Sequence, residues 1–114
     1  MELLKLLDSK SFIERYAVLD NRTWDTGFYY KVRVYLQDAS LFQASEYKQL
    51  TERVYAFHWQ DAEGRLIIRW DNAPHHKLLS TYPHHKHLPS GVEESTAMTL
   101  EEALLHIEAF LNSA

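Results

Sequence analysis

Residues 30–36, with the sequence YKVRVYL, indicate the fold class because large apolar side chains alternate with other side chains along them. In an extended chain Tyr30, Val32 and Val34 would line one face, and the residues between them would line the other. A period of two of this kind is typical of a β-strand that buries one face against a core. We therefore predict a half-buried strand here, in a fold that contains a sheet.

Similar signals surround this stretch. Alternation continues over residues 40–47 and 52–60, and a mostly apolar run covers residues 65–70. The DAEG sequence of residues 61–64 is typical of a hairpin loop. Residues 11–20 fit either a helix or a strand, and we favour a strand. Consecutive strands with short connections predict an antiparallel meander of four to five strands.

Two helices are expected to flank this sheet. Leucines recur at helical spacing over residues 2–9, which predicts a short N-terminal helix. Thr99 and Glu102 have the spacing of a capping box, and apolar residues follow them at helical intervals, which predicts a longer C-terminal helix. The expected architecture is therefore an α+β fold with one meander sheet and two helices, formed as a single domain by residues 1–114.

Composition excludes several classes of function. The chain has 114 residues and no cysteine, which excludes disulfides, thiolate metal sites and cysteine nucleophiles. Its formal net charge of −4 argues against a general electrostatic attraction to nucleic acid. The sequence contains no apolar run of membrane length and no signal-peptide pattern, so we expect a cytoplasmic protein with no membrane partner. A homodimer formed through a sheet edge or the aromatic face is also expected.

The seven histidines are unevenly distributed. Five of them lie in an aperiodic segment of about residues 71–91, which also holds all three prolines. A loop of this length in a compact domain is usually functional or disordered, and its aromatic and proline content favours a functional loop. No acidic residue lies between His75 and Gly91, so an anionic partner is expected to bind here. His58 and His106, outside the segment, are expected to be ordinary structural residues.

The clustered histidines suit acid–base catalysis on RNA. An imidazole has a pKa close to neutrality, so two of them with a cation can cleave a phosphodiester without a metal ion. A carboxylate beside them can orient one ring, and an aromatic side chain can stack a base. The predicted catalytic residues are His75, His76, His84, His85, His87 and Asp71. The predicted substrate-binding residues are Arg69, Asn72, Lys77, Lys86 and Tyr82.

Other interpretations stay open at this point. Imidazoles with a carboxylate also suit zinc, nickel or iron, although the spacing does not identify a metal. The ligands of such a divalent ion would be His75, His76, His85, His87 and Asp71. The loop could instead serve as a docking surface for a protein partner, or its imidazoles could satisfy loop backbone groups.

The same residues resemble a known family. The sequence WDNAPHH at residues 70–76, followed by PHHKH at residues 83–87, is similar to the two-part motif of the TumE family, the toxin component of TumE–TumA toxin–antitoxin pairs. The resemblance extends to HWQ at residues 58–60 and to the helix opened by Thr99. It implies a small prokaryotic toxin with a helix-turn-helix antitoxin as partner. Analogy with other small antiparallel-sheet toxins implies ribonuclease activity.

Overall fold

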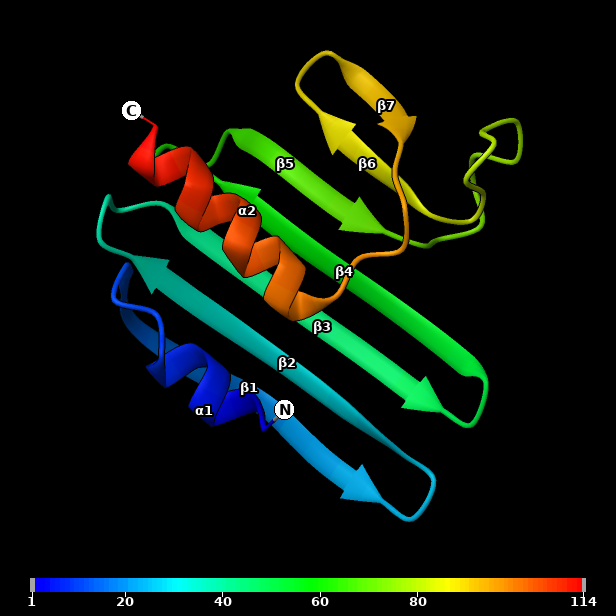
Figure 1. The fold of residues 1–114 in the computed structure, drawn as a ribbon, viewed down its shortest axis with the longest axis horizontal. Helices are drawn as coiled ribbons and strands as arrows, with labels where there is room; N and C mark the ends of the chain where they lie inside the picture. The colour runs from blue at the N-terminus through cyan, green and yellow to red at the C-terminus, as the bar shows by residue number, and fades with distance from the viewer. Residues whose placement is uncertain (1, 114) are drawn as a thin grey trace.

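Seven antiparallel strands and two helices make up residues 2–113, the part of the chain that the computed structural model describes (Figure 1). The strands lie in the sheet in the order in which they occur in the sequence, so the sheet is one uninterrupted meander. The elements, in chain order, are α1 Leu3–Asp8, β1 Ile13–Trp24, β2 Gly27–Leu36, β3 Leu41–Gln49, β4 Glu52–Gln60, β5 Leu66–Asp71, β6 His85–Leu88, β7 Gly91–Glu94 and α2 Leu100–Asn112.

The α+β character is confirmed, but the prediction of four to five strands is wrong. The ambiguous residues 11–20 do form a strand, as favoured, within β1. The additional strands are β6 and β7, each four residues long, and β6 lies inside the segment of residues 71–91 that was expected to be a loop. Strands this short do not establish a period of their own. Strand β6 forms because the backbone groups at the edge of β5 can pair with it. Strand β7 forms against the edge of β6 in the same way.

Both helices pack on one face of the sheet, in front of the strands in Figure 1. Alternate residues of the strands point toward them, and Val32 and Val34 are at most 1% exposed, as the alternation in β2 predicts. The largest fully buried side chains of the sheet are the aromatic residues Phe42, Tyr55, Phe57 and Trp59. Apolar residues of the helices cover this aromatic layer, which removes its surface from water and stabilises the fold.

The two helices begin at side-chain caps. In α2 the Thr99 hydroxyl accepts a hydrogen bond from the backbone N–H of Glu102, and the Glu102 carboxylate accepts one from the backbone N–H of Thr99. The predicted capping box is therefore present. In α1 the Glu2 carboxylate accepts hydrogen bonds from the backbone N–H groups of Leu4 and Lys5. Neither of these helices has the length and apolar character needed to cross a membrane.

The opposite face of the sheet, which we call the open face, carries no helix from residues 2–113. It presents the residues that alternate with the buried ones, because directly paired residues of antiparallel strands point to the same face. On strands β2 to β6 these include Lys31, Arg33, Gln43, Ser45, Ala56, His58, Arg69, Asp71, His85 and His87. Four of the side chains singled out in the sequence, Arg69, Asp71, His85 and His87, therefore lie on the face without helices.

Candidate functional site

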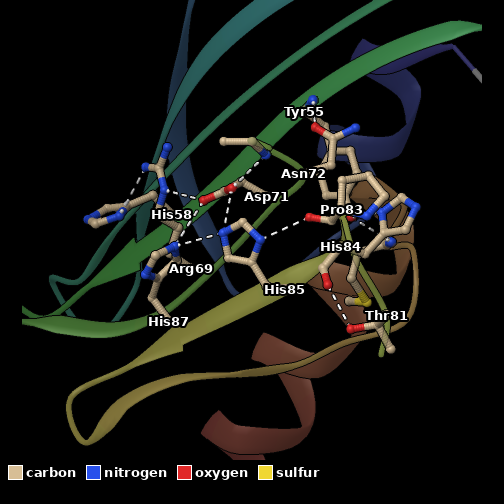
Figure 2. A network of polar contacts seen from close by, with 12 residues as sticks. Tyr55, His58, Arg69, Asp71, Asn72, Thr81, Pro83, His84, His85 and His87 are labelled. Carbon is tan, nitrogen blue, oxygen red and sulfur yellow. Dashed lines mark hydrogen bonds and ion pairs between the residues drawn. The ribbon is translucent and has the colours of Figure 1, made fainter. Parts of the chain in front are cut away.

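Strand register brings four of the predicted site residues together. Asp71 pairs with His85 across β5 and β6, and Arg69 pairs with His87. Residues two apart on a strand share a face, so all four side chains point to the open face. Figure 2 shows them gathered at the end of β5.

Asp71 is the centre of the site and is 5% exposed. Its Oδ1 accepts a hydrogen bond from the backbone N–H of Ala73 at 3.0 Å and lies 2.8 Å from Nε2 of His85. Its Oδ2 accepts one from Nε of Arg69 at 3.0 Å and lies 3.2 Å from Nε2 of His87. Burial raises the pKa of this carboxyl group, but its hydrogen bonds from Ala73 and Arg69 outweigh burial, so the pKa of Asp71 is lowered.

His85 lies between two hydrogen-bond acceptors, the Pro83 carbonyl and the Asp71 carboxylate. Its Nδ1 lies 2.9 Å from the carbonyl oxygen of Pro83, which can only accept, so Nδ1 carries a hydrogen. Its Nε2 then faces Asp71 at 2.8 Å and Nε2 of His87 at 3.1 Å. A bare Nε2 would direct its lone pair at a carboxylate oxygen, which is repulsive. Either a proton on Nε2 or a bound cation between these atoms removes the repulsion.

His76 completes the group from the segment that connects β5 and β6. Its ring centroid lies 4.7 Å from that of His85 and 5.8 Å from that of His87. One ring nitrogen from each of the three histidines lies within 4.8 Å of the other two. His85 is 2% exposed, whereas His76 and His87 are half-buried and reach the surface. We call Asp71, His76, His85 and His87 the His–Asp cluster, which has a buried inner pair and an accessible outer pair.

Burial also changes the pKa of His87, the accessible imidazole on β6. Burial lowers the pKa of His87, although the nearby Asp71 carboxylate opposes this effect. The neutral form of His87 is therefore favoured near neutral pH. A neutral imidazole can accept a proton, which is what a general base must do.

The structure places two predicted catalytic histidines outside the cluster. His75 is exposed on the connecting segment. His84 precedes β6 and turns away from the cluster toward Tyr55, whose hydroxyl is hydrogen-bonded to its Nδ1 at 2.8 Å (Figure 2). The two rings stack with centroids 5.8 Å apart, and burial lowers the pKa of His84. This histidine helps to attach the connecting segment to the core.

Asn72 also lies outside the cluster, and its side chain bonds to the backbone of β4. Its side-chain amide donates a hydrogen bond to the carbonyl of Arg53 at 2.7 Å and accepts one from the backbone N–H of Tyr55 at 3.0 Å. These bonds satisfy the backbone of β4 at the point where β5 ends. The hydrogen bond from the backbone N–H of Ala73 to Asp71 forms an Asx-type turn directly after β5.

The remaining predicted substrate-binding residues are separated from the cluster. Lys77 and Tyr82 are exposed on the connecting segment. Lys86 pairs with Trp70, and the Trp70 ring meets His106 of α2 with centroids 5.1 Å apart, so Lys86 lies on the helix-covered face. Within residues 2–113, Arg69 is the one predicted substrate-binding residue that forms a hydrogen bond or an ion pair with the His–Asp cluster.

His58, expected to be an ordinary residue, lies next to Arg69. The two residues pair across β4 and β5, and Nη1 of Arg69 approaches Nδ1 of His58 at 3.5 Å. Burial, and then the charge of Arg69, lower the pKa of His58. A hollow of about 270 Å³ opens beside this pair on the open face and reaches Lys31. The hairpin loop at residues 61–64 indicates that β4 and β5 pair, but His58 comes opposite Arg69 only because the register shifts between Trp59 and Gln60, which the sequence did not signal.

Nearly the whole chain is similar to one protein family. The family model described as Toxin TumE matches residues 3–113. The matched range includes every helix and strand and all members of the His–Asp cluster. No curated protein and no solved structure matches the chain.

Proposed function

Because the chain belongs to the TumE toxin family, we propose that this toxin acts by cleaving RNA at the His–Asp cluster. The observation that carries the proposal is the convergence of two accessible imidazoles, His76 and His87, on the buried His85 ring, beside a buried carboxylate that accepts a hydrogen bond from a guanidinium. Acid, base and cation are the groups that phosphodiester cleavage requires. They lie on an open sheet face, where a polymeric substrate has access.

The proposed reaction uses the two accessible histidines. One imidazole, from His76 or His87, takes the proton of a ribose 2′-hydroxyl while that oxygen forms a bond to phosphorus. The bond from phosphorus to the 5′ oxygen breaks, and the other imidazole, in its protonated form, gives a proton to the departing oxygen. The products are a 2′,3′-cyclic phosphate and a free 5′-hydroxyl. The Arg69 guanidinium stabilises the negative charge that develops on the phosphoryl oxygens.

The buried pair of the cluster positions the accessible groups. Asp71 accepts a hydrogen bond from Arg69 and lies 3.2 Å from Nε2 of His87, so it can orient both side chains. A hydrogen on Nε2 of His87 would be held by Asp71, which leaves Nδ1 for proton transfer. His85 lies under this arrangement and is held by the Pro83 carbonyl.

Cleavage of RNA by the purified chain in the presence of a chelator tests this function. His76→Ala and His87→Ala should each lower the cleavage rate by about 100-fold or more, because each removes one proton-transfer group. His75→Ala is the matched control, since it removes an adjacent but exposed imidazole and should cleave at the full rate. Melting temperatures verify that the variants are folded. Full cleavage by both His76→Ala and His87→Ala would refute the proposal.

A divalent metal ion is a second candidate for the same site. The Pro83 carbonyl holds Nδ1 of His85, so Nε2 points into the group of three imidazole nitrogens within 4.8 Å of each other. A backbone carbonyl behind an imidazole is the usual support of a metal-binding histidine. Three histidines suit zinc and leave a position for a water molecule. Stoichiometric zinc in untagged protein, with activity lost to a chelator and restored by zinc, would favour this candidate over metal-free catalysis.

Membership of a toxin family implies an antitoxin partner. We extend this to the helix-turn-helix type suggested by the sequence resemblance, and to a complex in which the partner covers the His–Asp cluster. Co-expression with the product of the adjacent gene tests both points. A stable complex that no longer cleaves RNA supports the extension, and a complex that cleaves at the full rate contradicts coverage of the cluster.

A further inference from the structure

Two rows of side chains cross the open face and end at the His–Asp cluster. In the first row, strand pairing places Lys31 beside Ser45, Ser45 beside Ala56, and Ala56 beside Asp71. Asp71 in turn pairs with His85. Paired residues point to the same face, so this row runs from β2 to β6 without a break. It connects a lysine on an early strand with the inner pair of the cluster.

The second row lies next to the first and is polar throughout. Its members, in order across β2 to β6, are Arg33, Gln43, His58, Arg69 and His87. Within β2 to β6 the rows carry three permanent cations and one carboxylate, which is buried and bonded to a guanidinium. Beyond them, Asp20 of β1 pairs with Lys31, and Glu94 of β7 pairs with His85. The net charge of the chain is −4, so this face departs from the average of the whole molecule.

The hollow on this face has a simple cause in the sequence. Ser45 and Ala56 are small, and they occupy neighbouring positions in the middle of the first row. Longer side chains, among them Lys31, His58 and Arg69, rise around them and leave a space of about 270 Å³. Three strand spacings, about 14 Å of backbone, separate β2 from β5, and a long cationic side chain from each of these strands, Lys31 and Arg69, lines the hollow.

We propose that the two rows bind the phosphate backbone of single-stranded RNA, with one phosphate in the hollow between Lys31 and Arg69 and the strand continuing to the His–Asp cluster. This inference rests on the proposed cleavage of RNA and identifies how its substrate binds. Lysine and arginine contacts to phosphates supply most of the affinity of proteins for nucleic acid. Arg69 lines the hollow and also bonds to Asp71 of the cluster, so a phosphate bound in the hollow leaves its neighbour within reach of the imidazoles.

The lining of the hollow favours RNA over a protein partner. Its apolar members are alanines, and the other described residues around it are polar or cationic. The centre of a protein–protein interface is usually apolar and rich in aromatic residues. Here the aromatic side chains of β4 point to the other face, under the helices. The chemistry of the hollow therefore matches a phosphate rather than an apolar anchor of an antitoxin.

Binding of a fluorescent single-stranded RNA with 2′-O-methyl riboses tests the inference apart from cleavage, since this RNA lacks the attacking hydroxyl. The dissociation constant is measured by anisotropy between about 50 and 200 mM salt. Lys31→Gln and Arg33→Gln should each weaken binding and reduce the slope of log Kd against log salt by about 0.7, the value for one phosphate contact on a single strand. Ser45→Tyr, which fills the hollow without changing the charge, should also weaken binding.

Lys5→Gln is the matched control, because it removes one positive charge from α1 on the other side of the sheet. It should leave both the dissociation constant and the salt slope unchanged. The inference is wrong if Lys31→Gln and Lys5→Gln bind this RNA with the same affinity. It is also wrong if the open-face variants bind RNA as the wild type does and fail only to bind an antitoxin. Binding of the methylated RNA without cleavage of ordinary RNA would instead refute the proposed function and leave this inference standing.

Discussion

Replacing Asp71 with alanine should destabilise the fold far more than the loss of a surface carboxylate. Its two oxygens lie 2.8–3.2 Å from donors on Ala73, Arg69, His85 and His87. Water can hydrate Arg69 after the change, because that side chain is 38% exposed, but His85 is 2% exposed and stays without an acceptor. Breaking a buried pair in this way costs roughly 3–5 kcal/mol. A loss at the lower end would lower the melting temperature by roughly 10–20 °C.

The effect should also depend on pH. The pKa of Asp71 is lowered in the folded protein, because its hydrogen bonds and neighbouring charges outweigh burial. A carboxyl group with a lowered folded pKa stabilises the fold at pH values above its unfolded pKa, near 3.9, and loses this contribution as the pH falls through the folded pKa. The difference in unfolding free energy between wild type and Asp71→Ala should therefore be complete at pH 7 and should shrink below about pH 4.

Urea unfolding followed by tryptophan fluorescence measures this difference, since Trp59 and Trp70 are buried in the core. Asp20→Ala is the matched control. Asp20 pairs at 3.2 Å with Arg22, two residues away on the same strand, but these side chains are 38% and 66% exposed. An exposed pair of this kind contributes about 0.2–1 kcal/mol. Equal losses in the two variants would refute the argument that burial makes Asp71 important to stability.

Smaller effects are expected elsewhere. Thr99→Ala removes the α2 cap and should cost about 1 kcal/mol in urea unfolding; an unchanged midpoint would contradict a role for the cap. Ser40→Ala leaves the buried indole N–H of Trp59, now 2.9 Å from the serine hydroxyl, without an acceptor, at a cost of about 1–3 kcal/mol in chemical unfolding. Burial, with a smaller effect of Lys86, lowers the pKa of His106, so the unfolded chain takes up the proton more readily and stability falls as the pH drops below about 6.5. Between pH 7 and pH 5 the melting temperature of His106→Phe should fall less than that of the wild type. An equal fall in both proteins would show that His106 does not cause the pH dependence.

The sequence predicted the elements that carry their own pattern. Strand β2 alternates because one of its faces is buried, and α2 has both a capping box and an apolar stripe. Strand β6, with the sequence HKHL, has no such alternation of apolar and polar residues. Its formation depends on pairing with the edge of β5, which nothing in the four residues of β6 itself signals. The strand count was underestimated for this reason.

For a related reason, only part of the candidate site could be predicted from the sequence. The composition of residues 71–91 indicated a reactive segment, but it could not separate His84 from His85. Adjacent residues of an extended chain point to opposite sides, and pairing with β5 decides which one faces the cluster. His85 thereby reaches Asp71, while His84 reaches Tyr55. The role of His58 was missed because it depends on its register with Arg69.

By itself, the sequence determined the α+β class, the strands with one buried face, the capped C-terminal helix and the position of the histidine-rich segment. These are local properties, because each is a period or a spacing within about twenty residues. The tertiary structure decided which side chains meet, since a strand's pattern specifies which face is buried but not every register with its neighbours. Pairing along the meander places Lys31, Arg69 and the His–Asp cluster on one face, although Lys31 and Arg69 lie on strands far apart in the chain.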